Sequence, residues 1–234
     1  MTLQQNRRVI FLAACLAFCN TAALAGEDKV QQVPDFGRVV DPDGDSKIEA
    51  NDGKLKITLP GTKVHDLSGV REENSRNAPR VLQEVEGDFT ATVKVTCALE
   101  PARQEKNNSF NGAGLLVWEN DKNFMRLERN LWVTPDGQRV SYAPLFEYWH
   151  NNQCNTLKGG TTTPYFKGAS TYLRITRAGD EFKTAVSHDG GKWMETDSVT
   201  ATMPRKVKVG VAAINSAPNA FTAEFSDLKV DKRK

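Results

Sequence analysis

Alternation of apolar and polar residues with a period of two restricts the fold of this chain more than any other feature. It is clear in residues 55–59 and 89–95, and it returns in segments 172–176, 182–186, 207–211 and 221–225. Successive side chains of an extended strand point to opposite faces, so this period predicts β-strands with one buried face. Turn-forming residues such as Asn51-Asp52-Gly53 and Asp189-Gly190-Gly191 lie between these segments.

Many short strands without helical periodicity or a βαβ rhythm predict an all-β fold, an antiparallel sandwich of two sheets. Residues 26–234 show no break in composition, and we expect them to form a single domain. Segments 68–78 and 153–170 are expected to be long loops, which often carry binding groups on a rigid sandwich.

The first 25 residues are typical of a secretory signal peptide. Arg7-Arg8 precede a short apolar run that ends near Ala23-Leu24-Ala25, a small-x-small cleavage site. The run is shorter than the roughly 20 residues that span a bilayer, so we expect a secreted or periplasmic protein without a transmembrane segment. Two alternatives stay open: a lipoprotein anchored through Cys15, and twin-arginine export.

Charge and cysteine content narrow the functional classes. Two of the 31 Lys and Arg residues lie in this leader and none of the 29 Asp and Glu residues does, so the remaining chain has no net charge. We therefore expect no nucleic-acid partner.

The leader also contains two of the four cysteines. For an exported protein the remaining pair, Cys97 and Cys154, predicts one disulfide, with two separate buried thiols as the alternative.

Several blocks carry a resemblance to a known family. They include residues 36–45, Leu59-Pro60-Gly61-Thr62, His65-Asp66-Leu67, residues 77–82, residues 112–118 and residues 123–129. In these blocks the chain resembles a family of uncharacterised bacterial secreted domains similar to the yeast regulator-of-enolase protein, within the concanavalin A-like lectin/glucanase superfamily. The resemblance implies a two-sheet jelly roll. It implies no defined activity, because the superfamily includes lectins, glycosidases and interaction modules.

The segment Asp41-Pro42-Asp43-Gly44-Asp45 places carboxylates at three alternate positions, as a Ca²⁺-binding loop does. An EF-hand would need Gly at position 46 and Glu at position 52, where this chain has Ser46 and Asp52. Asp, Pro and Gly are also common turn formers, and a solvated turn is the favoured interpretation of the same residues. We therefore expect no cofactor, with a calcium ion at Asp41, Asp43 and Asp45 as the alternative.

The segment from Glu119 to Asn123 is the nearest match to the carboxylate motif of laminarinase-type glycosidases. The residue that should be the acid is Asn123, and the segment has the composition of a hairpin turn. The three histidines lie in separate segments without a metal-ligand spacing. These departures argue against an enzyme. In Ser187-His188-Asp189-Gly190-Gly191-Lys192-Trp193, which is similar to an Asp-box, we expect a folding hairpin without a catalytic role.

A candidate binding face follows from alternation in residues 123–133 and 145–151. If Met125 and Leu127 point into the core, the residues that alternate with them along the strand face the other way. A similar outward pair follows in residues 145–151. The candidate ligand-binding residues are Arg126, Glu128, Trp132, Glu147 and Trp149. Aromatic rings beside Arg and Glu groups suit the apolar faces and hydroxyls of sugars, although packing of a sandwich uses the same residues.

The leading hypothesis is a secreted, non-enzymatic module that binds carbohydrate on the concave sheet. The alternatives are a glycoside hydrolase or lyase that acts on polysaccharide, and an envelope or extracellular protein-interaction domain. The expected partner is thus a glycan or an extracellular protein.

Overall fold

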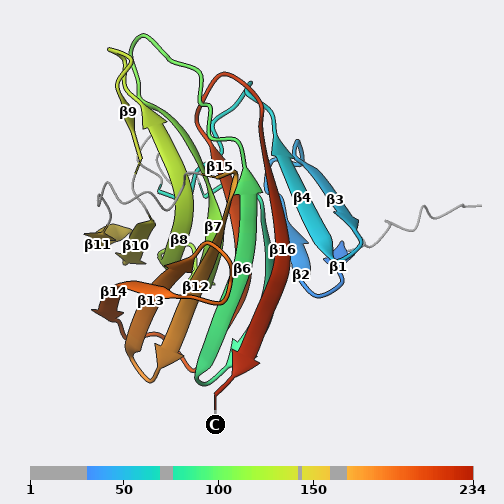
Figure 1. Ribbon diagram of the computed structural model, residues 1–234, viewed down its shortest axis with the longest axis vertical. Helices are drawn as coiled ribbons and strands as arrows, with labels where there is room; N and C mark the ends of the chain where they lie inside the picture. Colours follow the sequence, from blue (N-terminus) through green and yellow to red (C-terminus); the bar gives the residue numbers. More distant parts are fainter. Residues whose placement is uncertain (1–30, 69–75, 142–143, 159–167, 234) are drawn as a thin grey trace, which may run out of the picture.

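A computed structural model of the chain describes residues 31–68, 76–141, 144–158 and 168–233. Within these ranges the chain forms two antiparallel sheets and no helix, so the prediction of an all-β sandwich is confirmed (Figure 1). The same ranges hold no helix with the length and apolar character that crossing a bilayer requires. The predicted leader and Cys15 lie outside the described residues.

The larger sheet has nine strands among the described residues. In spatial order they are β1 (Gln32–Val33), β2 (Gly37–Val40), β5 (Arg80–Glu86), β15 (Lys206–Asn215), β7 (Ser109–Asn120), β8 (Asn123–Val133), β10 (Leu145–His150) and β11 (Gln153–Lys158), with β9 (Arg139–Val140) paired to β8.

The smaller sheet has seven strands among the same residues. In spatial order they are β14 (Met194–Thr200), β13 (Glu181–Ser187), β12 (Ser170–Ala178), β6 (Phe89–Cys97), β16 (Phe221–Lys232), β4 (Lys54–Leu59) and β3 (Lys47–Asn51).

The main hydrophobic core lies between the two sheets. On β6 the inward side chains Phe89, Ala91, Val93 and Val95 are fully buried, and the residues between them are partly exposed. Met125 and Leu127 of β8 enter the same core, as their alternation predicts. Burial of apolar surface on this scale is the main favourable contribution to the folding of such a sandwich.

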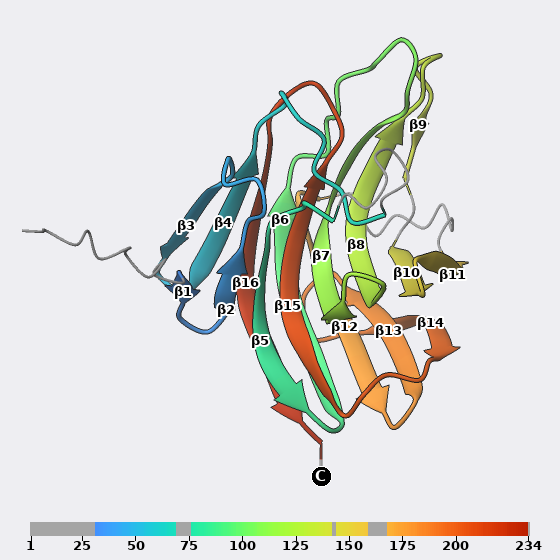
Figure 2. The same cartoon turned by 180° about the vertical axis from the view of Figure 1, so that it is seen from behind.

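A second apolar cluster covers the outer face of the nine-stranded sheet. It contains Leu116, Trp118, Phe124, Trp149 and Ile214 from the strands, together with Leu67 and Ala78 from the connection between β4 and β5. The described parts of this connection, residues 60–68 and 76–79, lie on that side of the sheet (Figure 2), and His65 forms two backbone hydrogen bonds with Asn215 of β15. One outer face of the sandwich is therefore partly buried under a long connection.

The turn predictions are confirmed where residues are described. Asp52 and Gly53 have positive φ values of 49° and 71°, which a tight β3–β4 hairpin requires. In the β13–β14 hairpin, Asp189 Oδ1 accepts the N–H groups of Gly191 and Lys192, and Trp193 donates to the Gly190 carbonyl. The hydrogen bonds from the N–H groups of Lys192 and Gly191 and from the Ser187 hydroxyl lower the pKa of Asp189 to about 2.

The expected loop 153–170 is wrong in part. Residues Gln153–Lys158 form β11, which pairs with β10 at the edge of the sheet. Its polar, Asn-containing sequence gives no strand signal, and the pairing comes from a short turn after His150 in which Asn151 and Asn152 both have positive φ. Residues 159–167 lie outside the described residues.

Candidate functional site

Four of the five predicted binding residues line one pocket on the outer face of the nine-stranded sheet. Arg126 and Trp132 come from β8, and Glu147 and Trp149 come from β10. Arg126 and Glu147 are direct cross-strand partners in the β8–β10 register. The fifth residue, Glu128, is buried next to Arg126 and is not part of the pocket wall. The register thus brings together residues that are far apart in the sequence.

Arg126 is the centre of a buried charge cluster. Its Nε donates to Glu147 Oε2 at 2.6 Å, and its Nη1 donates to Glu128 Oε1 at 3.4 Å. The same Nη1 lies 3.7 Å from Asp66 Oδ1. Trp149 adds a hydrogen bond from Nε1 to Glu147 Oε2 at 2.7 Å. We call Arg126, Glu128, Glu147 and Asp66 the carboxylate cluster.

The carboxylate cluster raises the pKa values of Glu128 and of Arg126, with opposite consequences for their charge. Burial, together with the nearby Glu147 and Asp66 charges, outweighs the opposing effect of Arg126 and raises the pKa of Glu128 to about 7. Burial by itself favours the neutral form of Arg126, but Glu128, Glu147 and Asp66 outweigh it, so the pKa of Arg126 is raised. Arg126 therefore stays charged, and Glu128 is the member that takes up a proton near neutral pH.

Glu128 fits beside β7 because β7 has glycine there. Gly114 is its cross-strand partner, and a Cβ added at Gly112 would lie 2.7 Å from Glu128 Oε2 and 2.6 Å from the Phe110 ring. Glu128 Oε2 is buried and has no hydrogen-bond partner among the described residues. A buried carboxylate oxygen without a donor is costly, which agrees with the raised pKa of this carboxyl group.

The pocket has a volume of about 350 Å³ and a mixed lining. Trp132, Trp149, Phe110 and Ile214 form its apolar part, and Arg126, Glu147 and Asp66 contribute charged groups. Trp149 stacks on Phe124 with ring centroids 5.8 Å apart, and Phe110 packs against Trp132 at 4.6 Å. This volume lies at the lower end of the roughly 300–1,000 Å³ typical of small-molecule sites.

Asp66 is a site residue that the sequence analysis did not identify as one. Its N–H donates to Asn77 Oδ1, and its carboxylate accepts the N–H groups of Leu67 and Ser68 at 2.7 and 3.1 Å. No local pattern places it near β8, because its position depends on where the β4–β5 connection lies against the sheet. The nearest sequence signal is the block His65-Asp66-Leu67, which carries a family resemblance and no prediction of a binding role.

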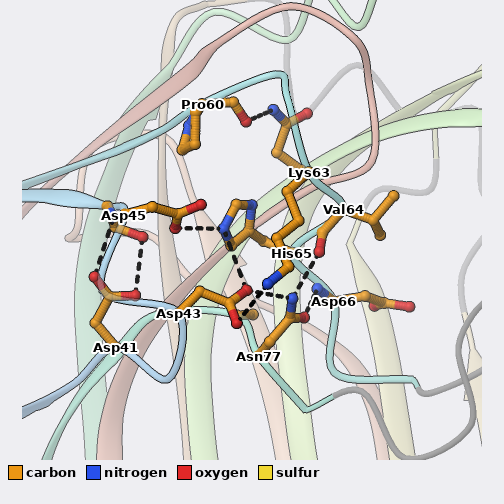
Figure 3. A network of polar contacts seen from close by, with 12 residues as sticks. Asp41, Asp43, Asp45, Pro60, Lys63, Val64, His65, Asp66 and Asn77 are labelled. Carbon is orange, nitrogen blue, oxygen red and sulfur yellow. Dashed lines mark hydrogen bonds and ion pairs between the residues drawn. The ribbon is translucent and has the colours of Figure 1, made fainter.

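A polar network fixes the connection that carries Asp66 (Figure 3). Asn77 Nδ2 donates to Asp43 Oδ2 and to the Val64 carbonyl, both at 2.7 Å. His65, which is fully buried, lies with Nε2 2.8 Å from Asp45 Oδ1. The loop at residues 41–45 thus holds residues 64–66 in place, and Asp66 in turn reaches the carboxylate cluster.

The three aspartates predicted to bind calcium do not converge. Asp41 accepts hydrogen bonds from the N–H and the hydroxyl of Ser46, both at 3.1 Å. Possible metal-ligand atoms instead lie within 4.8 Å of one another on Asp43, Asp45 and His65. Lys63 Nζ lies 2.8 Å from Asp43 Oδ1. Burial of Asp43 opposes its ionisation, yet hydrogen bonds from Lys63 and Asn77 lower its pKa overall. Calcium binding at Asp41, Asp43 and Asp45 stays a prediction, and the network has a structural role without it.

The predicted disulfide between Cys97 and Cys154 is wrong in this structure. Cys97 ends β6 and is buried between the two sheets, where burial raises the pKa of its thiol to about 11. Cys154 is exposed on β11 and lines the pocket on the outer face of the other sheet. The two side chains therefore lie on opposite faces of the nine-stranded sheet, and a disulfide needs Cβ atoms about 4 Å apart.

No protein-family model matches this chain, and a search of curated proteins returns no match. The solved structures do offer similar folds. One is a functionally unknown protein from Saccharomyces cerevisiae, with a TM-score of 0.63 and 16% identity over 80% of this chain and 92% of that chain. Another is a GH43 protein from Bacillus licheniformis, with a TM-score of 0.51 and 13% identity over 88% of this chain and 38% of that chain. At these identities the likeness shows a shared β-sandwich fold, and membership of the regulator-of-enolase-like family stays a prediction.

Proposed function

We propose that this chain is an exported β-sandwich domain that binds carbohydrate in the outer-face pocket and does not cleave it. The observation that carries the proposal is the lining of the pocket, where Trp132 and Trp149 lie beside Arg126, Glu147 and Asp66. Flat aromatic rings pack on the C–H faces of sugars, and planar guanidinium and carboxylate groups form paired hydrogen bonds with neighbouring hydroxyls. Export rests on the predicted leader alone.

The geometry of the charged groups supports binding more than catalysis. Glu147 Oε2 is held by both Arg126 and Trp149, and Asp66 is held by the backbone of its own connection. Groups that are fixed before the ligand arrives lose little conformational entropy on binding. The volume of about 350 Å³ suits a short stretch of a glycan chain, such as its end.

Affinity electrophoresis of the purified protein in native gels that contain single polysaccharides tests this proposal. We expect retardation by at least one polysaccharide, and we expect Trp132→Ala and Trp149→Ala each to abolish most of it. Trp193→Ala is the matched control, because Trp193 lies in the β13–β14 hairpin of the other sheet. Circular dichroism and a thermal melt establish that each variant is folded.

Two results would overturn the proposal. One is the absence of retardation on every polysaccharide tested, which would leave the protein-interaction alternative. The other is retardation that the folded Trp132→Ala and Trp149→Ala proteins both keep in full, because the pocket would then play no part.

One observation favours a second function, polysaccharide hydrolysis or elimination. The pKa of Glu128, about 7, is suitable for a general acid beside the second carboxyl group, that of Glu147. However, Glu128 does not line the pocket, and Arg126 bonds to both carboxylates. Release of reducing ends or of unsaturated, ultraviolet-absorbing products by the wild type, abolished in Glu128→Gln, would establish this function. Their absence with a polysaccharide that binds supports the non-enzymatic proposal.

A further inference from the structure

We infer that the ligand of this pocket carries a protonated amino group, as a hexosamine with a free amine does. The inference rests on the proposed function and adds the chemical class of the glycan. It starts from an imbalance of charge around the pocket together with a buried oxygen that has no donor.

The imbalance is visible in the described residues around the pocket. Asp66, Glu128 and Glu147 are three carboxylates, and Arg126 is the guanidinium that contacts all three. Arg76 is a second guanidinium, 5.3 Å from the centroid of the Trp149 ring. With both counted, the described groups still hold one more negative charge than positive charge when all are ionised. A cation of unit charge would complete the balance.

Glu128 is the group whose ionisation is affected by this imbalance of charge. Its Oε2 is buried without a donor, and the space that Gly112 leaves free is bordered both by this oxygen and by the ring of Phe110, which is part of the pocket wall. In the free protein a proton on Glu128 relieves the repulsion from Glu147 and Asp66, which is consistent with the raised pKa of Glu128. A bound ammonium group would supply the missing positive charge and allow Glu128 to ionise.

The lining indicates an organic cation more than a metal ion. In the described part of the chain, the possible metal-ligand atoms come within 4.8 Å of one another at Asp43, Asp45 and His65. These residues lie outside the carboxylate cluster. The pocket instead presents the aromatic residues Trp132, Trp149 and Phe110, whose ring faces attract ammonium groups. An amino sugar combines an ammonium group with hydroxyls and an apolar ring face, so it can use every part of this lining.

The test compares two ligands of equal length by isothermal titration calorimetry near pH 6.5, a chitosan oligomer with free amines and its fully N-acetylated counterpart. We expect the wild type to bind the free-amine oligomer about tenfold more tightly, the effect of one additional charged hydrogen bond. In Glu128→Gln, which keeps the shape and removes the charge, we expect this preference to fall to about threefold or less. Asp66→Asn is a second charge-removing variant on a different segment.

Glu84→Gln is the matched control, because Glu84 is an exposed carboxylate on β5 of the same sheet, paired with Lys206. We expect it to keep the full preference. A smaller preference in Glu84→Gln than in the wild type would show general attraction between charges and would overturn the inference.

Coupling between the proton on Glu128 and the ligand gives a further readout. The charged groups that face Glu128 are Arg126 of β8, Glu147 of β10 and Asp66 of the β4–β5 connection. Between about pH 5.5 and pH 7, we expect the ratio of wild-type to Glu128→Gln affinity for the free-amine oligomer to rise, because Glu128 ionises over this range. The titration of the ligand is common to both proteins and cancels in the ratio.

The outcomes separate this inference from the proposed function. Equal affinity for the two oligomers, or tighter binding of the acetylated one, overturns the inference and leaves carbohydrate binding standing. If neither oligomer binds but a neutral polysaccharide retards the protein in a gel, the inference fails alone. If nothing binds in either experiment, both fail.

Discussion

The outer faces of the two sheets carry polar residues at the same alternate strand positions, yet they differ in their exposure to water. On β6 of the seven-stranded sheet, Thr90, Thr92 and Lys94 are partly exposed. On β8 of the nine-stranded sheet, Arg126 and Glu128 are buried. The difference comes from the β4–β5 connection and the second apolar cluster, which cover part of the nine-stranded sheet. Alternation therefore identifies the face of a side chain but does not determine its exposure.

The same difference sets the energetic role of an ion pair on each face. Lys54 and Glu224 pair at 3.0 Å on the seven-stranded sheet, with 57% and 30% of their side chains exposed. Arg126 and Glu147 pair at 2.6 Å with 5% and 8% exposed. Water and salt screen the first pair, whereas loss of one partner from the second leaves a buried charge without compensation. Three predictions test this contrast, and the expected effects become smaller in turn.

The largest effect is expected for Arg126→Met. It leaves Glu147, Glu128 and Asp66 near one another without their shared cation, so we expect a loss of about 3–5 kcal/mol in the free energy of unfolding. Urea denaturation at neutral pH measures this loss. Lys47→Met is the control, because Lys47 is exposed on β3 and pairs only with Glu49 among the contacts described. A loss below about 1 kcal/mol for Arg126→Met would mean that water reaches the carboxylate cluster.

The second effect concerns the pH dependence of stability. The pKa of Glu128 is about 7 in the folded protein, above its ordinary value of 4.5, so the folded state holds this proton more tightly than the unfolded state. The contribution of Glu128 is fully present below about pH 4.5 and is lost as the pH rises through 7. The size of this loss is at most about 3 kcal/mol.

Glu128→Gln isolates that contribution because glutamine does not titrate. We expect the unfolding free energy of the variant relative to the wild type to rise between about pH 5 and pH 8. Urea denaturation of both proteins at several pH values measures the difference, and Glu84→Gln serves as the surface control. A difference that stays constant with pH would mean that Glu128 is already ionised across this range.

Much of the sandwich was predictable because burial follows a strict period on several strands. β6 and β12 alternate along their whole length, and the predicted segments lie inside them. β14 and β11 were not predicted. The burial pattern of β14 is irregular, and its pairing with β13 contains a bulge. Such edge strands owe their conformation to the neighbouring strand more than to their own residues.

Only the residues of the candidate site that lie on strands could be predicted from the sequence. Alternation around Met125 and Leu127 placed Arg126, Glu128 and Trp132 on one face, and the same reasoning placed Glu147 and Trp149. It did not bring in Asp66, because that residue reaches Arg126 through Asn77 and the His65–Asn215 pairing, which are contacts between distant segments. It also paired two cysteines that belong to different sheets and lie on opposite sides of the nine-stranded one, because a count of cysteines contains no geometry.

The smallest effect is expected at the exposed pair Lys54 and Glu224. A double-mutant cycle with Lys54→Met and Glu224→Gln should give a coupling energy of at most about 1 kcal/mol, which decreases further in about 1 M salt because the Debye length falls to about 3 Å. Thermal or urea unfolding of the four proteins measures it. The same cycle on Arg126→Met and Glu147→Gln should give a larger coupling that changes little with salt, because its partners are buried. Equal couplings on the two faces would mean that the connection over the nine-stranded sheet does not exclude water from the Arg126–Glu147 pair. The two ion pairs would then differ in their place in the fold and not in their energetic role.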